Sequence, residues 1–388
     1  MITTAVQTTT TLMTNADNLQ TVEGESPSPE PQPAPRRGWW RRWWWAIALA
    51  TVTSVIAAVV IGAMVIKVPY VIESPGSLYQ TTDRVSISGA TPYPTEDKIA
   101  LVTVSVDNRV TALEKFFADH NGDDVVVPAK EVLGSQTPAQ NDELNRLLMT
   151  QSKDDAVLLA LQKLGYDVHP TATGAIVQET VQGGAAEGKI QVAETIVSID
   201  DKPITSRDDL TNVLGTYKPG DTITIGLEAT DGTTRTVSIP LGENPQKPGG
   251  AFLGVSITSR LVYPDLPVKV TVNSGDIGGP SAGLAFTLGI LDLMTPGDLT
   301  GGHEVAVTGT VDSTGAVGPI GGIETKVVAV AREHVKYFLV PADNADAARA
   351  KAPKDLQIVP VHTIDEALSF LATIGGRGLP ATSPATNQ

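Results

Sequence analysis

The feature that most constrains this chain of 388 residues is an uncharged run of 24 residues, Trp43 to Ile66. At ~1.5 Å per residue, a helix of that length crosses the ~30 Å hydrocarbon core of a bilayer with some tilt. All five Trp residues lie between Trp39 and Trp45, which is typical of a membrane interface. We therefore expect an uncleaved single-pass anchor over residues 39–67.

The basic residues beside this run predict its orientation. Four arginines precede it and form the densest basic cluster of the chain: Arg36, Arg37, Arg41 and Arg42. Basic flanks favour the cytoplasmic side, so we expect everything after Lys67 to lie outside the cell membrane. A cleaved signal peptide is the main alternative, because Ala48–Ala50 resembles a cleavage site. The apolar run continues too far beyond it for a signal sequence.

Composition excludes several classes of protein. The chain has no Cys, which rules out disulfides, thiolate metal sites and a Cys nucleophile. Its net charge of −15 argues against nucleic acid as a partner. The word GGAAEGK at 183–189 has the spacing of a phosphate-binding loop, but Ile190 stands where Ser or Thr would hold magnesium. We expect no metal, no cofactor and no dependence on ATP.

Residues 168–241 contain short strand-like segments separated by turn signals, and one short helix that opens at Ser206. The words VQGGAAEGKI and ETIVSIDDKPITSRDDL make this stretch resemble a PDZ domain of the bacterial membrane-protease type. The resemblance implies peptide capture by strand addition. It places that site at Gly174, Ala175, Ile176 and Val177. Alternatively, these four residues simply begin an edge strand.

The sequence GDIGGPSAGLAFTLGILDLM sets Ser281 in a Gly/Pro-rich turn at the start of an apolar helix. A serine there lies among unpaired N–H groups at the positive end of a helix dipole, and such donors could hold an oxyanion. The alternative is that Ser281 has no catalytic role and only caps the helix.

A lone lysine lies 45 residues later, in GGIETKVVAVA. Ala329 and Val330 share or adjoin the helical face of Lys326. An apolar surface disfavours the charged amine and lowers its pKa, and a neutral amine can accept the proton of a serine. The alternative is an exposed lysine on a surface helix.

The word GPSAG also satisfies the G-x-S-x-G pattern of α/β-hydrolases. A Ser-His-Asp hydrolase is disfavoured because residues 273–280 separate Ser281 from the preceding strand-like segment, and because the domain has only about 120 residues. His303, His334 and His362 lie downstream, but none lies in a loop that marks it as a base.

Residues 270–341 resemble the proteolytic domain of Lon-type Ser–Lys peptidases, through GPSAG at 279–283, TGT at 308–310 and GAVGPIGGIETKVVAV at 315–330. The resemblance implies that Ser281 is the nucleophile, Lys326 the base and Thr308 its support. It places the backbone oxyanion donors at Gly279, Pro280 and Ser281. Gly278 stands where classical members carry Asp, and the ATPase module is absent, as in an ATP-independent, PDZ-containing, membrane-anchored bacterial subfamily.

We therefore expect an α/β (α+β) protein acting as a membrane-anchored, ATP-independent serine endopeptidase on unfolded or exposed extracytoplasmic protein segments. Self-assembly into a homo-oligomer is implied by the resemblance alone. The alternative is an inactive, membrane-tethered PDZ scaffold. The expected segments are a disordered cytoplasmic tail (1–38), a transmembrane helix (39–67), a mixed α/β extracytoplasmic region (68–164), a PDZ-like domain (165–243), a linker (244–250), a Lon-like proteolytic domain (251–372) and a disordered tail (373–388).

Overall fold

A computed structural model of the chain describes residues 39–94, 98–134, 136–262, 266 and 268–379. The expected N-terminal tail, 1–38, and the last nine residues of the expected C-terminal tail, 380–388, lie outside these residues. The chain divides into two compact units, Met1–Ala58 and Val59–Gln388. The functional residues predicted from the sequence all lie in the second unit.

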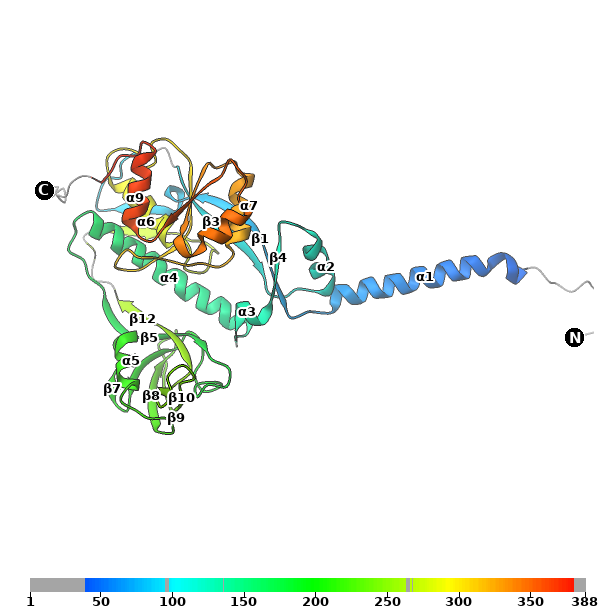
Figure 1. Ribbon diagram of the computed structural model, residues 1–388, viewed down its shortest axis with the longest axis horizontal. Helices are drawn as coiled ribbons and strands as arrows, with labels where there is room; N and C mark the ends of the chain where they lie inside the picture. Colours follow the sequence, from blue (N-terminus) through cyan, green and yellow to red (C-terminus); the bar gives the residue numbers. More distant parts are fainter. Residues whose placement is uncertain (1–38, 95–97, 135, 263–265, 267, 380–388) are drawn as a thin grey trace, which may run out of the picture. The chain divides into compact units, whose positions relative to one another are not determined.

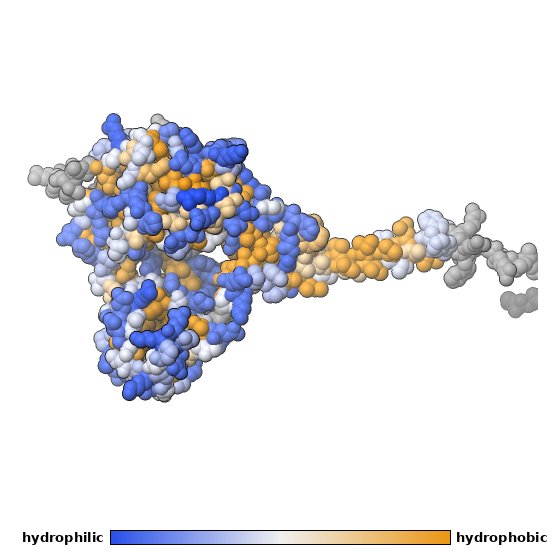
Figure 2. Space-filling view, viewed as in Figure 1, coloured by the Kyte–Doolittle hydropathy of each residue, from blue (hydrophilic) through white to orange (hydrophobic). Residues whose placement is uncertain are grey.

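Helix α1 runs from Trp39 to Val65 and ends close to the predicted boundary. Its segment Trp43–Val65 has a mean hydropathy of 2.4 and is not buried against the rest of the protein. Figure 2 shows apolar residues along its length. Among the described residues it is the one helix long and apolar enough to cross a membrane. A helix that is apolar on every side and remains exposed has no protein core to bury it, so this helix could be a membrane span.

The larger sheet has six strands in the order β18-β17-β14-β3-β1-β4. Strand β14 is parallel to both β3 and β17, and β1 is antiparallel to β3 and β4. The strands are β1 (Tyr70–Gln80), β3 (Ile99–Asp107), β4 (Val125–Pro128), β14 (Val305–Val307), β17 (Tyr337–Pro341) and β18 (Gln357–Val361). The regions 68–164 and 251–372, which the sequence analysis separates, therefore contribute strands to one sheet.

Helices cover both faces of this sheet, which explains the continuous apolar runs of its central strands. Leu101 and Val307 belong to a core shared with α4 (Pro138–Lys163), α6 (Gly283–Met294) and α9 (Ile364–Thr373). Val102 and Ala306, one residue away on each strand, belong to a core on the other face, with α7 (Ile323–Arg332) and α8 (Ala345–Lys351). This alternation is the two-residue period of a β-strand.

Helix α4 is longer than the sequence patterns indicate. The apolar spacing predicts two helices, 141–149 and 154–164, whereas the structure has one continuous helix. It opens with a reciprocal capping box between Thr137 and Gln140, and Pro138 occupies the first turn. Helix α4 packs against α6 and also contacts the loop that carries Ser281.

The second sheet has the order β12-β5-β6-β8-β9, with β7 paired to β6. Its elements are β5 (Thr171–Thr180), β6 (Thr195–Ile199), β7 (Lys202–Pro203), α5 (Arg207–Leu214), β8 (Thr222–Glu228), β9 (Thr234–Pro240) and β12 (Val255–Val262). Buried Ile196, Ile199 and Leu210 lie in its separate core. Strand β12 pairs with β5 along its whole length, although the sequence analysis assigns it to the C-terminal domain.

The expected linker, 244–250, lies between two short paired strands, β10 (Gly242–Glu243) and β11 (Ala251–Phe252). The remaining elements are η1 (Thr82–Arg84), β2 (Val85–Ser88), α2 (Ala112–His120), α3 (Ala129–Leu133), β13 (Lys269–Val272), β15 (Thr310–Val311), β16 (Val317–Gly318) and η2 (Ala342–Asn344). Figure 1 shows where α2 and α3 lie.

Candidate active site

Ser281 lies in the loop between β13 and α6, two residues before the helix begins. The N-cap position belongs to Ala282, and no side chain caps this helix. The side chain of Ser281 therefore does not cap the helix, and its hydroxyl is free to face the neighbouring elements. The turn before it requires a glycine, because Gly279 adopts a positive φ of 82°, a conformation that a side chain would strain.

Four of the hydrogen bonds that hold this loop, residues 273–282, come from α4 and from residues 308–309. The Gly279 N–H donates to the carbonyl oxygen of Asn145 at 2.9 Å, and the Ser152 hydroxyl donates to that of Pro280 at 3.0 Å. On the other side, the Gly309 N–H donates to the carbonyl oxygen of Ser281 at 2.9 Å, and the Thr308 hydroxyl donates to the same oxygen at 3.2 Å. Helix α4, where the sequence showed no chemistry, therefore fixes the loop from one side.

The close approach of α4 and α6 depends on a glycine. A Cβ atom at Gly283 would lie 2.9 Å from the Ser152 hydroxyl oxygen and 3.0 Å from a methyl group of Val311. The second glycine of GPSAG thus lets α4 reach the loop, and it has a packing role independent of any catalytic one.

Lys326 lies in the second turn of α7, and only 1% of its surface is exposed. Its Nζ atom lies 2.9 Å from Ser281 Oγ and 2.9 Å from Thr308 Oγ1. Thr308 is fully buried directly after β14, and its N–H donates to the carbonyl oxygen of Leu339. The structure therefore brings together the three side chains that the sequence analysis selected, and Lys326 is not the exposed surface lysine of the alternative reading.

Burial determines the charge of this amine. Desolvation disfavours the ammonium form and lowers the pKa of Lys326 to about 7, while the nearby Glu73 carboxylate acts in the opposite direction and raises this pKa. The pKa of Glu73, on β1, is itself raised by burial. Near neutral pH a large fraction of Lys326 is therefore uncharged and able to accept a proton.

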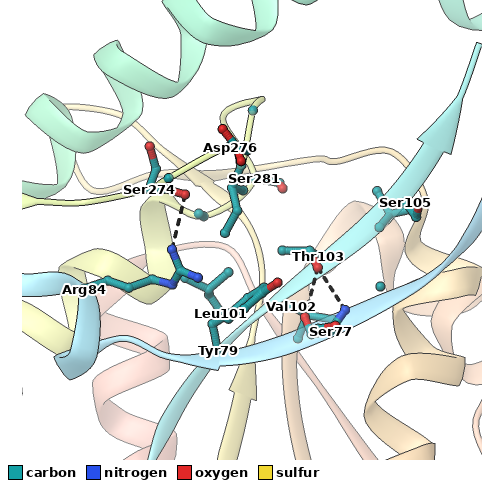
Figure 3. A pocket seen from close by; sticks show the side chains of 16 residues that line it. Ser77, Tyr79, Arg84, Leu101, Val102, Thr103, Ser105, Ser274, Asp276 and Ser281 are labelled. Carbon is teal, nitrogen blue, oxygen red and sulfur yellow. Dashed lines mark hydrogen bonds between the residues drawn. The ribbon is translucent and has the colours of Figure 1, made fainter.

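Ser281 lies where two pockets meet. One, of about 550 Å³, is lined by β1, β3 and residues 274–278 of the serine loop. Figure 3 shows this pocket, with Arg84 donating to the carbonyl oxygen of Ser274 and with Thr103 bonded to Ser77 on the adjacent strand. The other, of about 610 Å³, contains Glu73, Asn145 and Lys326. Ser281 belongs to the lining of both pockets.

The predicted oxyanion donors need correction. Pro280 has no N–H, and the N–H of Gly279 is already donated to Asn145. The N–H of Ser281 has no acceptor within the part of the chain that the structure describes. Of the three predicted positions, only Ser281 therefore retains a backbone donor for a developing oxyanion.

The predicted peptide-binding residues, 174–177, also need correction. They lie in β5, which is flanked on both sides: Ala175 and Ile176 pair with β12 and with β6. The N–H of Gly174 donates to Thr205, and that of Val177 donates to Glu194. An interior strand offers no edge to an added peptide, so capture cannot occur there.

In the part of the chain that the structure describes, β12 and β9 are the two edge strands of this sheet, and a groove of about 950 Å³ lies between β12 and α5. Leu210 and Leu214 of α5 line one side of the groove. Residues 251–257 line the other, and Gly254 has a positive φ of 79°. The signal in the sequence was PGGAFLGV, a glycine-rich turn before an apolar strand, at 248–255.

The histidines do not approach Ser281. All five belong to the described part of the chain, and none lines either pocket that contains the serine. His362 is exposed beside Glu366, and His303 stacks edge-on against Tyr337. The geometry gives no Ser-His-Asp arrangement.

Comparison with known proteins identifies two domain families in the chain. A family model of the Lon protease (S16) C-terminal proteolytic domain matches residues 256–373, and one of the PDZ domain matches residues 162–241. The chain thus carries a Lon-type proteolytic domain and a PDZ domain, beside the apolar helix α1.

Individual relatives match the C-terminal region. A Lon protease of Rickettsia bellii is 37% identical over 116 residues, which are 29% of this chain and 15% of the relative. A Lon protease of Campylobacter concisus is 34% identical over 108 residues, which are 27% of this chain and 13% of the relative. The chain therefore spans about one seventh of the length of these relatives.

Among solved structures, the PDZ domain of the SdrC-like protein from Listeria monocytogenes matches 22% of this chain and 87% of its own length, at 19% identity and a TM-score of 0.20. The corresponding domain from Listeria innocua matches 22% of this chain and 92% of its own length, at 21% identity and a TM-score of 0.20.

Proposed function

We propose that this chain, which carries a Lon-type proteolytic domain and a PDZ domain, is a membrane-anchored serine endopeptidase that uses Ser281 and Lys326 as a dyad. One observation carries the proposal: the amine of Lys326 lies 2.9 Å from Ser281 Oγ and is almost completely buried. Burial keeps a large fraction of the amine neutral near pH 7, and a neutral amine is what a serine nucleophile needs as its base.

The reaction follows from this geometry. Lys326 Nζ accepts the proton of Ser281 Oγ while that oxygen attacks the carbonyl carbon of the scissile peptide bond. The N–H of Ser281 stabilises the oxyanion of the tetrahedral intermediate. The ammonium then donates its proton to the leaving amine, and an ester to Ser281 remains. Water attacks the ester and loses a proton to Lys326, and the ammonium returns that proton to Ser281 Oγ as the bond to the acyl carbon breaks and the carboxylic acid product leaves.

We assign the PDZ domain the recruitment of substrates. Its edge strand β12 and the apolar side chains of α5 suit a peptide that adds as a strand and places an apolar side chain in the groove. The proposed substrates are unfolded or exposed protein segments on the outer side of the membrane. Their location rests on the predicted orientation of α1, whose apolar segment Trp43–Val65 follows the basic cluster Arg36–Arg42 in the sequence.

The proposal includes independence from ATP. In the GGAAEGK turn, the carboxylate of Glu187 accepts a hydrogen bond from the N–H of Gly183 at 2.8 Å. The backbone N–H of Gly183, which a bound phosphate would need, is therefore already donated to a carboxylate of the same loop. In addition, the side chain of Ile190 offers no ligand for magnesium.

A fluorogenic unfolded protein, digested by the purified full chain in detergent, tests the dyad. We expect Ser281→Ala and Lys326→Ala each to lose at least about 10³-fold in kcat/KM. Ser86→Ala and Lys336→Ala change exposed residues of the same types and should retain full activity. Equal turnover in all five proteins would eliminate the dyad. If none turned over any substrate, the tethered PDZ scaffold would be the better description.

A further inference from the structure

We propose that helix α2 is a second membrane contact, whose Phe116 and Phe117 side chains insert into the outer leaflet beside the end of α1. The inference rests on the proposed role of α1 as a membrane anchor. It assigns a lipid surface to a face of the protein that neither the active site nor the PDZ groove uses.

The backbone fixes α2 next to the end of the apolar helix. The N–H of Ala112, the first residue of α2, donates to the carbonyl oxygen of Ile66 at 2.9 Å. Lys67 and Thr111 form an isolated antiparallel bridge, and the N–H of Val68 donates to Val110 at 2.9 Å. Figure 1 shows α2 beside this end of α1. If α1 crosses the bilayer, α2 begins where the chain leaves the hydrocarbon.

Helix α2 exposes its two largest apolar side chains and buries a small one. Small Ala118 packs inward, 5% exposed, against Ile72 and Val110. The large Phe116 and Phe117 point outward, 56% and 62% exposed, with their rings edge to face at 5.8 Å. Two adjacent exposed aromatic rings are an unusual surface for water, but they suit the headgroup region of a bilayer.

The polar groups of α2 are satisfied within the helix and its surroundings. Glu114 caps the first turn with Thr111, and Lys115 pairs with Asp119 at 2.7 Å. The ammonium of Lys115 also lies 4.5 Å from the ring centre of Tyr70. A short helix with paired charges and protruding aromatic rings can lie in the interface without burying an unpaired charge.

The absence of Cys from the chain makes the test direct, because each introduced Cys is the only one. The full chain is reconstituted in nanodiscs of equal parts phosphatidylcholine and phosphatidylglycerol. A nitroxide is attached at Phe117→Cys, at Val59→Cys in α1, or at exposed Asn212→Cys in α5. Collisional relaxation by oxygen, which concentrates in lipid, is compared with relaxation by a water-soluble nickel chelate.

We expect the labels at positions 59 and 117 to favour oxygen and the label at position 212 to favour nickel, by several-fold in the ratio. A label at 117 that favours nickel, with 59 in lipid, overturns the contact of α2 and leaves the anchor standing. A label at 59 that favours nickel removes the anchor itself. A label at 117 that is shielded from both reagents, and whose spectrum sharpens on dilution with unlabelled chain, identifies a second copy as the occupant and overturns the proposal.

Discussion

The hydroxyl of Thr308 donates its only proton to the carbonyl oxygen of Ser281, at 3.2 Å. Its oxygen can therefore only accept from Lys326 Nζ, which lies 2.9 Å away. A neutral amine that donates one proton to Thr308 keeps its lone pair for another partner, and Ser281 Oγ lies at hydrogen-bonding distance. Thr308 thus orients both the base and the backbone of the nucleophile.

Replacing Thr308 with valine keeps the shape of the side chain and removes this acceptor. We expect kcat to fall about 10- to 100-fold, because a hydrogen bond of this kind contributes roughly 1.5–3 kcal/mol. KM should change little, since Thr308 lines neither pocket at the serine. Thr308→Ser should restore most of the rate, and a serine variant as slow as the valine variant would contradict the orienting role.

The pKa of Lys326, about 7, predicts the pH dependence of the reaction. Only the neutral amine can accept the serine proton, so kcat/KM should rise tenfold per pH unit below 7 and level off above about 8. A profile measured from pH 5 to 9 on a substrate without titrating groups checks this. If kcat/KM instead kept rising until about pH 10, the ordinary range of lysine, the amine would be solvated during turnover.

Replacing Glu73 should change the pH at which kcat/KM levels off. Its carboxylate faces the same pocket as Lys326, and its charge raises the pKa of the amine. Glu73→Gln removes the charge at nearly constant volume, so the pKa of Lys326 should fall and the kcat/KM profile should shift to lower pH. Glu131→Gln alters an exposed acid on α3 and should leave the profile unchanged. A shift to higher pH in Glu73→Gln would show that the carboxylate acts in another way.

The buried amine should also reduce stability. The unfolded chain binds this proton up to pH 10.5 and the folded chain only up to about 7, so the free energy of unfolding should rise with pH between those values. Lys326→Met should therefore be inactive yet more stable at pH 7, by about 1–4 kcal/mol. The gain should shrink as the pH approaches 10. Thermal unfolding at several pH values measures it, with exposed Lys336→Met as the control.

The sequence predicted the chemistry better than the support around it. Ser281 and Lys326 lie in short motifs that, each taken alone, also fit a helix cap and an exposed lysine, and it was the resemblance to Lon-type peptidases that selected them. Their separation of 2.9 Å depends on tertiary packing. Asn145 and Ser152 hold the serine loop from a helix more than 120 residues earlier, and no local pattern distinguishes them.

Two predictions failed because strand order is not local. Residues 174–177 have the sequence of an edge strand, but β12, which follows the expected linker, covers that edge. Likewise, β3 pairs in parallel with β14, about 200 residues later, so the segments that seemed separate share a sheet. In both cases the position of a strand in its sheet depends on its partner strand, and the local sequence pattern does not identify that partner.

The corrected position of the PDZ groove gives a final prediction. Leu214 is half-buried on α5 and lines the groove beside β12. Leu214→Glu places a carboxylate where an apolar peptide side chain and its terminal carboxylate would lie, so affinity for a fluorescent peptide with an apolar free C-terminus should fall at least about tenfold. Cleavage of a short fluorogenic peptide that has no free C-terminus should be unchanged, because that substrate needs only the cleft at Ser281.

Amidating the C-terminus of the binding peptide should weaken its affinity for the unmodified chain. Equal affinity for both peptides and both proteins would place recruitment elsewhere.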